Sequence, residues 1–288
     1  MTLVQNALKA FPAPAGGPFS FLKYSTPNSG RTLRDKVIFL AFEGGSSSPS
    51  LCIKTVRSYG ARETVLRSFE NLRSLNIATT GKSSALLFAQ GVHLHDDGEH
   101  IFSVETACEG ERVRLNASSL GRVVEAYVGF QSDVAVLPLR NLEELLPGVM
   151  RISGLSGEDQ RELEAFFDSL PPSSLKLPRA LQLGDLTEDN LLISSRGLSI
   201  VDYDRVGEVD LPGFDLLGLF RRFDGSRAKE LCEKYFPEYF SRIGAEGRGP
   251  LSRVLFLYYV AERTARKPYH LKDTTARSII SDFSELFL

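Results

Sequence analysis

Short apolar runs separated by polar turns fill the first third of the chain, a pattern typical of β-strands. Residues 36–42 (KVIFLAF) and 50–56 (SLCIKTV) flank the segment EGGSSSP, whose small polar residues suit a hairpin loop. Two more strand-like runs, SALLFAQ and HIFSVETA, lie on either side of a turn at residues 96–98. Between the two pairs, residues 61–75 predict an amphipathic helix, because apolar side chains recur three or four positions apart at Val65, Leu66, Phe69, Leu72 and Leu75.

The rest of the chain has the apolar spacing of helices. One helix is predicted to begin after Asn116, a suitable N-cap, and another after Ser156, which opens a sequence resembling a capping box. Further helices are predicted near residues 226–236, 250–267 and 272–287. A single hairpin interrupts them, formed by the two short apolar strands of LLI-SSRG-LSIV.

This order of elements predicts an α+β fold with two lobes. The strand-rich N-terminal lobe, with its one helix and a connector near residues 104–108, takes residues 1–108. The mostly helical C-terminal lobe takes residues 109–288. A chain of this length can bury a core in each lobe.

Charge and cysteine content narrow the class of protein. The formal net charge of -2 gives no reason to expect a nucleic-acid or membrane-surface partner. The 3 Cys residues are far apart and lack CxxC spacing, which argues against a disulfide framework or a cysteine-ligated metal. Neither a signal peptide nor an apolar run of about 18 residues is evident. We therefore expect a soluble cytoplasmic protein whose oligomeric state the sequence leaves open.

Acidic residues gather where the interrupting hairpin begins, in the segment LGDLTEDNLLI (residues 183–193). The turn is centred near residues 195–196, so Asn190 should lie across from about residue 201, next to Asp202. Carboxylate and carboxamide oxygens are hard ligands that suit Mg²⁺. Asp185, five residues before Asn190, lies where it could orient or deprotonate a hydroxyl group. A solvated turn is the alternative, because Asp and Asn are ordinary turn residues.

The motifs GDLTEDNLLI and LSIVDYDRVGEVDLPGFDLLGL together resemble the aminoglycoside phosphotransferase and choline kinase superfamily. The resemblance implies a protein-kinase-like fold with an antiparallel sheet in the N-terminal lobe. It also implies ATP- and Mg²⁺-dependent transfer of phosphate to a small-molecule hydroxyl. By this resemblance Asp185 is the catalytic base, Asn190 and Asp202 are the magnesium ligands, and Asp215 braces the catalytic loop.

The chain departs from the family pattern at two positions of these motifs. Leu183 stands where the family usually has a histidine before GD, and Tyr203 stands where it commonly has a tryptophan. Asp204 has two interpretations, an assistant to the metal site or an exposed carboxylate, and the second is favoured. A catalytically weak, kinase-like nucleotide-binding or interaction protein is therefore the alternative to an active enzyme.

The resemblance further implies a nucleotide clamp in the N-terminal lobe. Lys54, a charge in the middle of SLCIKTV, would bind phosphate and pair with Glu70 of the following helix, which is preferred over Glu63. A lysine reaching water from an edge strand is the alternative for Lys54. The phosphate-covering loop would contain Gly30, its only glycine. Adenine would be bound by the backbone of the connector, through residues that include Glu105 and Ala107.

Charge also bears on the acceptor. Residues 217–288, which build much of the acceptor pocket in the family, carry 13 Lys and Arg against 9 Asp and Glu, a balance of +4. An enzyme that binds a polycationic antibiotic needs carboxylates clustered around the amino groups of the antibiotic, because a buried ammonium group must be paired. We therefore expect a neutral or anionic acceptor, such as a sugar, nucleoside or biosynthetic intermediate, in preference to an aminoglycoside. Solvent-facing arginines are the alternative explanation for this charge balance.

Overall fold

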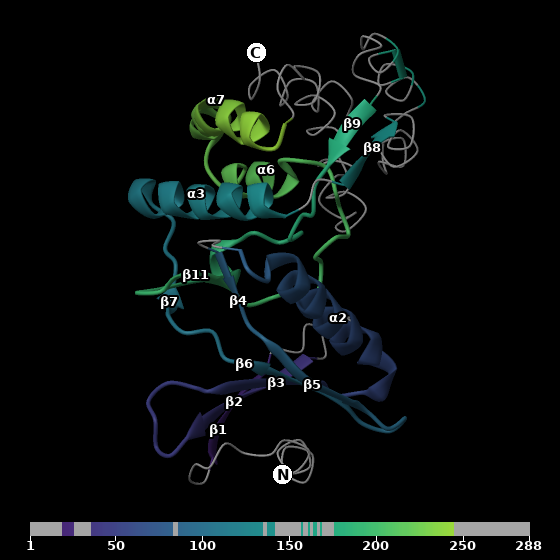
Figure 1. The fold of residues 1–288 in the computed structure, drawn as a ribbon, viewed down its shortest axis with the longest axis vertical. Coiled ribbons are helices and arrows are strands. Elements are labelled where there is room, and N and C mark those ends of the chain that lie inside the picture. Colours follow the sequence, from purple (N-terminus) through teal and green to yellow (C-terminus); the bar gives the residue numbers. More distant parts are fainter. Residues whose placement is uncertain are drawn as a thin grey trace. The chain divides into compact units, whose positions relative to one another are not determined.

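A computed structural model of the chain describes residues 19–25, 36–82, 86–134, 137–141 and 176–244, with scattered positions between 157 and 168 (Figure 1). The chain divides into two compact units. The first comprises Met1–Asp133 and Glu188–Val206, and the second Val134–Thr187 and Gly207–Leu288. The hairpin that interrupts the helical region thus groups with the N-terminal strands. The lobe boundary after residue 108 stays a prediction.

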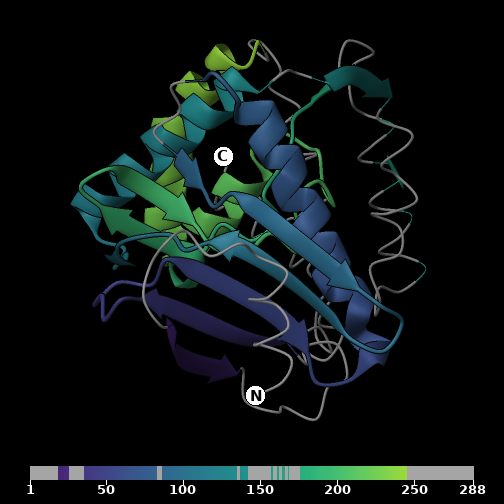
Figure 2. The ribbon, with the colours of Figure 1, turned by 60° about the horizontal axis from the view of Figure 1, so that its bottom comes forward.

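A five-stranded antiparallel sheet forms the base of the first unit (Figure 2). Its strands, in spatial order, are β1 (Phe19–Ser25), β2 (Lys36–Glu43), β3 (Leu51–Val56), β6 (Ile101–Thr106) and β5 (Gly91–Asp96). The two strands expected over residues 36–42 and 50–56 are confirmed as neighbours. Ala41, Ile53 and Phe102 belong to its buried core.

One strand pairing differs from the sequence prediction. The run SALLFAQ was expected to lie across the turn from HIFSVETA, but it provides β4 (Leu86–Phe88) of another sheet. The strand across that turn from β6 is β5, with the sequence GVHLHD. Alternation identifies strands but not which strands pair, because pairing depends on contacts distant along the chain.

Helix α2 (Arg62–Thr79) contacts β3, β5 and β6 of this sheet. The predicted amphipathic spacing is confirmed, although Leu66 is only partly buried. The fully buried positions of the helix are Val65, Ser68, Phe69, Leu72 and Leu75. The helix therefore presents a mainly apolar stripe to the sheet.

A second, four-stranded sheet holds the hairpin of the first unit. Its order is β4, β11 (Gly197–Ile200), β10 (Leu191–Ser194) and β7 (Glu111–Arg112), and β11 runs parallel to β4. The hairpin register is as predicted, with Ser194 opposite Gly197 and Leu191 opposite Ile200. Gly110 precedes β7 with φ +127, and a Cβ there would lie 2.5 Å from the Ile193 carbonyl oxygen, so only glycine fits.

Helix α3 (Ala117–Asp133) packs against β4 and completes the first unit. Asn116 is the N-cap that the sequence predicts, because its side-chain oxygen accepts hydrogen bonds from the N–H groups of Ser118 and Ser119. Phe130 of the helix lies against Phe88 of β4, with ring centroids 5.3 Å apart. This packing fixes the sheet that carries the hairpin.

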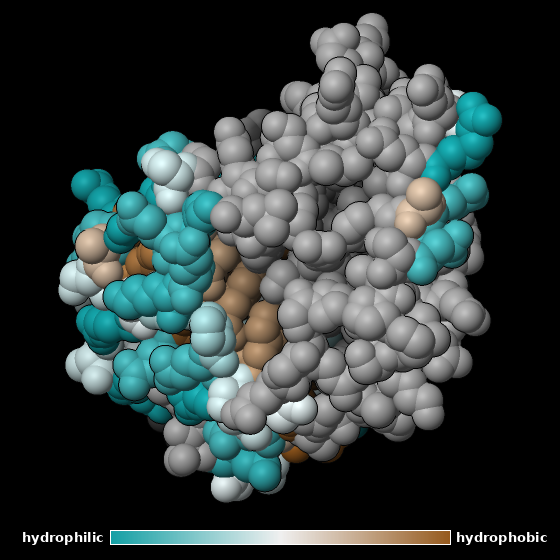
Figure 3. Space-filling model, turned by 90° about the horizontal axis from the view of Figure 1, so that it is seen from above, coloured by the Kyte–Doolittle hydropathy of each residue, from teal (hydrophilic) through white to brown (hydrophobic). Residues whose placement is uncertain are grey.

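The second unit contains the strand pair β8 (Leu137–Asn141) and β9 (Lys176–Arg179) and the helices α6 (Phe214–Phe220) and α7 (Gly225–Arg242). Helix α7, predicted near residues 226–236, buries Ala228, Leu231, Cys232, Phe236 and Tyr239. Figure 3 shows mostly hydrophilic side chains at the left of the view, with a band of hydrophobic residues next to them. None of the described helices is long and apolar enough to cross a membrane. The helices predicted after Ser156 and over 250–267 and 272–287 lie outside the continuously described residues.

Candidate active site

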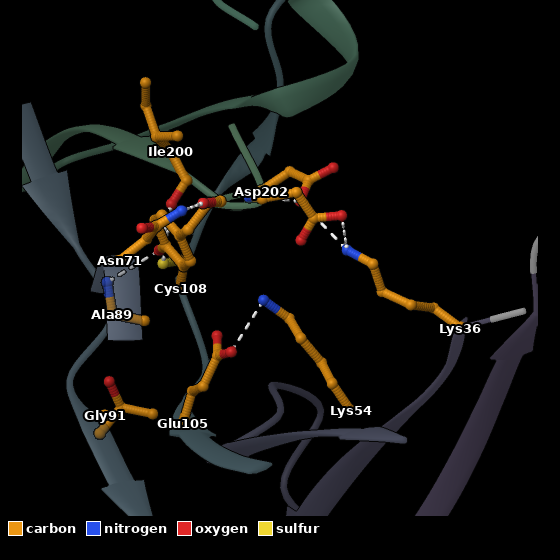
Figure 4. Close-up of polar contacts among 12 residues, drawn as sticks. Lys36, Lys54, Asn71, Ala89, Gly91, Glu105, Cys108, Ile200 and Asp202 are labelled. Atoms are coloured by element: carbon orange, nitrogen blue, oxygen red, sulfur yellow. Dashed lines mark hydrogen bonds and ion pairs between the residues drawn. The ribbon is translucent and has the colours of Figure 1, made fainter. Parts of the chain in front are cut away.

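Lys54 is a buried lysine in the middle of the five-stranded sheet (Figure 4). Its side chain is 3% exposed, and its Nζ lies 2.8 Å from Oε1 of Glu105 on β6. Lys54 pairs with Ser103 across the two strands, so Glu105, two residues further on, projects from the same face. Burial alone would lower the pKa of Lys54, but the Glu105 carboxylate raises this pKa above its ordinary value. The alternative of an edge lysine reaching water is therefore wrong.

The predicted partner of Lys54 is also wrong. Glu70 lies on the exposed side of α2, as does its rival Glu63, while Glu105 pairs with Lys54. The family resemblance favoured Glu70 because its spacing from Leu72 and Leu75 of the helix was taken to match the family pattern. The buried stripe passes through Phe69, however, and the next residue is rotated about 100° away from it. Asn71 of α2 contacts the segment that follows the hairpin, because its Nδ2 donates to the Tyr203 carbonyl at 2.7 Å.

Two hydrogen bonds fix the side chain of Tyr203 next to Lys54. Its side chain is fully buried, and its hydroxyl group donates to the Ile200 carbonyl at 2.5 Å. The oxygen of this hydroxyl also accepts a hydrogen bond from the Ala89 N–H at 3.1 Å. The Lys54 ammonium lies 4.9 Å from the centroid of the Tyr203 ring, within range of a cation–π interaction. Burial raises the pKa of Tyr203, so the phenol stays protonated and can donate.

Lys36, at the start of β2, binds both aspartates that follow the hairpin. Its Nζ is 3.4 Å from Oδ1 of Asp202 and also forms an ion pair with Asp204. Burial would raise the pKa of Asp202, but Lys36 and Lys54 outweigh this effect and lower it, so the Asp202 carboxylate stays ionised. The expectation of an exposed Asp204 is wrong, since its side chain is 25% exposed and one of its oxygens is buried. Lys36 could not be predicted as a site residue from the sequence, because its partners lie 166 residues or more away along the chain.

Asn190 and Asp202 lie at the same end of the hairpin, as the predicted register requires. Asn190 ends the short 3₁₀ turn Glu188–Asn190, and its carbonyl accepts from the Val201 N–H at 3.1 Å. Among the described residues no three His, Cys, Asp or Glu side chains gather as a metal site. One ionised carboxylate and one carboxamide fit Mg²⁺, which commonly takes one or two protein carboxylates and completes its shell with phosphate and water. The residues present therefore fit this ion.

The loop before Asp185 is braced within the second unit. Asp215, 3% exposed at the start of α6, accepts hydrogen bonds from the N–H groups of Leu183 at 2.6 Å and Gly184 at 2.8 Å. Gly184 has φ 79, a left-handed conformation that suits glycine. Asp185 itself is partly buried. These are the contacts that the predicted brace requires, and they fix the two peptides immediately before Asp185.

Gln182 and Tyr239 extend this polar network, and the sequence analysis missed both. Gln182 is fully buried, and its Oε1 accepts from the backbone N–H of Asp215 at 3.2 Å. The Tyr239 hydroxyl accepts from the Gly213 N–H at 3.0 Å, at the N-terminus of α6. A glutamine beside an apolar residue before GD is the signal that could have revealed the network.

The remaining predicted nucleotide contacts are only partly described. The Ala107 N–H donates to the Ser50 carbonyl at 2.9 Å, so this donor is used within the sheet and an adenine contact would need another group of the connector. The side chain of Glu105 forms the ion pair with Lys54. Gly30 and the basic residues beyond position 250 lie outside the described residues.

Solved structures share this fold. Neither a protein-family model nor a curated protein matches the sequence. The GDP complex of a mutant aminoglycoside 2'-phosphotransferase-IIIa matches with a TM-score of 0.56 and 15% identity, over 99% of this chain and 94% of that one. A choline/ethanolamine kinase family protein from Mesorhizobium loti matches with a TM-score of 0.52 and 17% identity, over 98% and 92%. A thermostable mutant of aminoglycoside phosphotransferase APH(4)-Ia, with AMP-PNP and hygromycin B, matches with a TM-score of 0.61 and 11% identity, over 100% and 98%.

These similarities cover nearly the whole chain at low identity. The chain therefore has the protein-kinase-like α+β fold of the aminoglycoside phosphotransferases and choline/ethanolamine kinases, and the predicted fold class is confirmed. A shared fold does not by itself establish activity, which has to be argued from the residues of the site.

Proposed function

We propose that the chain is an ATP-dependent phosphotransferase that moves the γ-phosphate of ATP to a hydroxyl group of a small molecule. The observation that carries the proposal is the buried Lys54, close enough to Asp202 for each to shift the pKa of the other. A buried cation next to an ionised carboxylate suits nucleotide phosphates and their metal ion. Several solved structures of this fold hold nucleotides, among them GDP, ATP and AMP-PNP complexes.

In this proposal Lys54 binds the nucleotide phosphates, and Asn190 and Asp202 hold Mg²⁺. The ion supplies positive charge that neutralises the phosphates during transfer. The lowered pKa of Asp202 supports this role, because only the ionised carboxylate is a good ligand. Lys36 already neutralises part of that charge, so it is expected to weaken the metal site.

Asp185 is proposed as the residue that orients the acceptor hydroxyl. As the hydroxyl oxygen bonds to the γ-phosphorus, the bond to the bridging oxygen of ADP breaks and the hydroxyl proton passes to the Asp185 carboxylate. This role requires a fixed backbone, which Asp215 supports by accepting from the two peptide N–H groups before Asp185. Catalysis of this type depends on positioning more than on covalent chemistry.

The acceptor class is proposed from charge. The balance of +4 over residues 217–288 favours a neutral or anionic sugar, nucleoside or biosynthetic intermediate. Solved structures of the same fold include complexes with kanamycin, streptomycin and hygromycin B, so aminoglycosides are the natural comparison set. Efficient phosphorylation of an aminoglycoside would overturn the charge argument and leave the kinase proposal standing.

A catalytically weak nucleotide-binding protein is the second candidate. Two observations favour it: Leu183 stands where the family usually has a histidine and is buried, and Lys36 pairs with the proposed metal ligand Asp202. In this case the chain would bind nucleotide and transfer phosphate slowly or not at all.

Thermal melting with and without nucleotide tests both candidates. We expect ATP to raise the melting temperature when Mg²⁺ is present, and to do so less in EDTA. ADP formation should then depend on an acceptor in a screen of sugars, nucleosides, choline and aminoglycosides. Stabilisation without acceptor-dependent turnover would favour the weak-binding candidate. If no nucleotide stabilises the chain, both candidates are wrong.

A further inference from the structure

We propose that the side chain of Glu105 positions Lys54 for nucleotide phosphate, the role that the family resemblance gave to Glu70 of α2. The inference rests on the proposed function. It starts from the carboxylate of Glu105, which lies 2.8 Å from Lys54 as its ion-pair partner among the described residues, with both side chains 3% exposed. Glu105 is thus assigned as a positioning residue, separate from any contact that its backbone makes.

The sheet itself fixes this pair. Lys54 and Glu105 project from one face of neighbouring strands, and the antiparallel ladder from Leu51–Thr106 to Thr55–Phe102 sets their separation. A pair between a strand and a helix would change whenever the helix moved. A pair within one sheet keeps its geometry as long as the ladder is intact.

Helix α2 makes a different contact with the site. Asn71 donates a hydrogen bond to the Tyr203 carbonyl. The Tyr203 hydroxyl makes two hydrogen bonds, and the ring faces the Lys54 ammonium. The helix therefore supports the segment that follows the hairpin, while Glu105 contacts the lysine from β6 (Figure 4). Glu70 is exposed on the same helix and provides a matched control.

Lys54 keeps hydrogen-bonding capacity for a ligand. Its Nζ contacts Oε1 of Glu105 at 2.8 Å, and no further acceptor for Nζ is found among the described residues. An ammonium carries three donors, so a phosphate can be bound without breaking the ion pair. Glu105 should therefore affect the binding of phosphates and leave the binding of the nucleoside unchanged.

The test compares ATP and adenosine binding, by calorimetry in Mg²⁺, among the parent, Glu105→Gln, Glu105→Asp and Glu70→Gln. We expect Glu105→Gln to weaken ATP binding about tenfold or more, because it removes the charge that holds the buried lysine. Adenosine affinity should change less than twofold, Glu105→Asp should recover part of the ATP affinity, and Glu70→Gln should match the parent.

A double-mutant cycle with Lys54→Met covers the case in which Glu105→Gln folds poorly. The double variant Lys54→Met/Glu105→Gln leaves neither charge of the pair unpaired, and it should bind ATP as weakly as Lys54→Met alone. Additive losses, an equal loss of adenosine and ATP, or a loss in Glu70→Gln without one in Glu105→Gln would each overturn the inference. A parent that binds no ATP would instead overturn the proposed function, and this inference with it.

Discussion

At the scale of single residues, each of two lysines in the large sheet is matched to acidic partners. Lys54 pairs with Glu105, and Lys36 pairs with Asp202 and Asp204. A buried pair stabilises little in total, but removing one member leaves an uncompensated charge and costs about 3–5 kcal/mol. The Lys54 pair is therefore expected to be sensitive to single substitutions, whereas the partly exposed cluster of Lys36, Asp202 and Asp204 is open to exchange with a metal ion.

Replacing Lys36 should strengthen metal binding. We expect Lys36→Met to bind Mn²⁺ several-fold more tightly than the parent without nucleotide, because an ammonium 3.4 Å from Asp202 repels a second cation. Titration followed by the electron paramagnetic resonance of free Mn²⁺ measures the affinity. Lys23→Met, on an exposed position of β1, is the matched control and should leave the affinity unchanged. Weaker binding in Lys36→Met would mean that the lysine organises the site.

Replacing Asp185 should separate catalysis from binding. We expect Asp185→Asn to lower turnover by about 10²–10⁴-fold, the usual contribution of a general base, while ATP affinity stays within twofold of the parent. Single-turnover assays with the best acceptor from the screen measure the rate, and calorimetry measures the affinity. Asp189→Asn, at an exposed position on the same loop, should turn over like the parent. Equal rates for the parent and Asp185→Asn would remove Asp185 from its proposed role.

At the scale of elements, local sequence patterns predicted those features of the fold that depend on residues close together in the sequence. Turn chemistry gave the register of β10 and β11, and apolar spacing gave α2 and α7. The partners of Lys54 and Lys36 were not predictable in this way, because they depend on which strands pair and on contacts between segments far apart in sequence. The strand β5, inserted beside β6, shows the same limit. Distant pairing is decided by the packing of the whole sheet.

The polar network at the N-terminus of α6 shows how the chain has adapted to a leucine before GD. Leu183 is 2% exposed, and its N–H already donates to Asp215, so the loop is held through its backbone. Gln182 provides the buried polar side chain next to it. The loop therefore does not need an imidazole at position 183 to keep its shape.

Restoring the family histidine should destabilise this element. We expect Leu183→His to lower the free energy of unfolding by about 1–3 kcal/mol, because a buried imidazole needs a hydrogen-bond partner where leucine needs none. Urea denaturation followed by circular dichroism measures the change. Ile77→His, at a position 73% exposed on α2, is the control and should be nearly neutral. Unchanged stability with higher turnover would show instead that the loop lacks a brace in the parent.

At the scale of the whole molecule, the residues proposed for phosphate transfer are distributed over both compact units. Lys54, Glu105, Asn190 and Asp202 belong to the first unit, and Asp185 and Asp215 belong to the second. The catalytic-loop segment crosses from one unit to the other between Thr187 and Glu188. Conditions that unfold either unit should therefore abolish phosphate transfer.

Alkaline pH should destabilise the folded chain through its buried thiols. Burial raises the pKa of Cys232 from 9.0 to about 12, and it raises the pKa of Cys52 in the same way. Between these values the unfolded chain loses protons that the folded chain keeps, so stability is fully present below pH 9 and falls as the pH rises. At pH 10 the loss is about 1.4 kcal/mol for each thiol.

Urea denaturation at pH 8, 9 and 10 measures this loss. The buried Cys232 offers the cleaner test, because the charged residues that shift its pKa are Arg221 and Glu233, whereas Lys54 and Glu105 of the proposed site act on Cys52. Cys232→Ala should show a shallower fall than the parent over this range, by about 1.4 kcal/mol at pH 10, even if its stability at pH 8 is lower. The buried lysine does not interfere, since its ordinary pKa of 10.5 and its raised value in the fold both lie above the range measured. Parallel pH profiles for the parent and Cys232→Ala would mean that the Cys232 thiol ionises as readily in the folded chain as in the unfolded one.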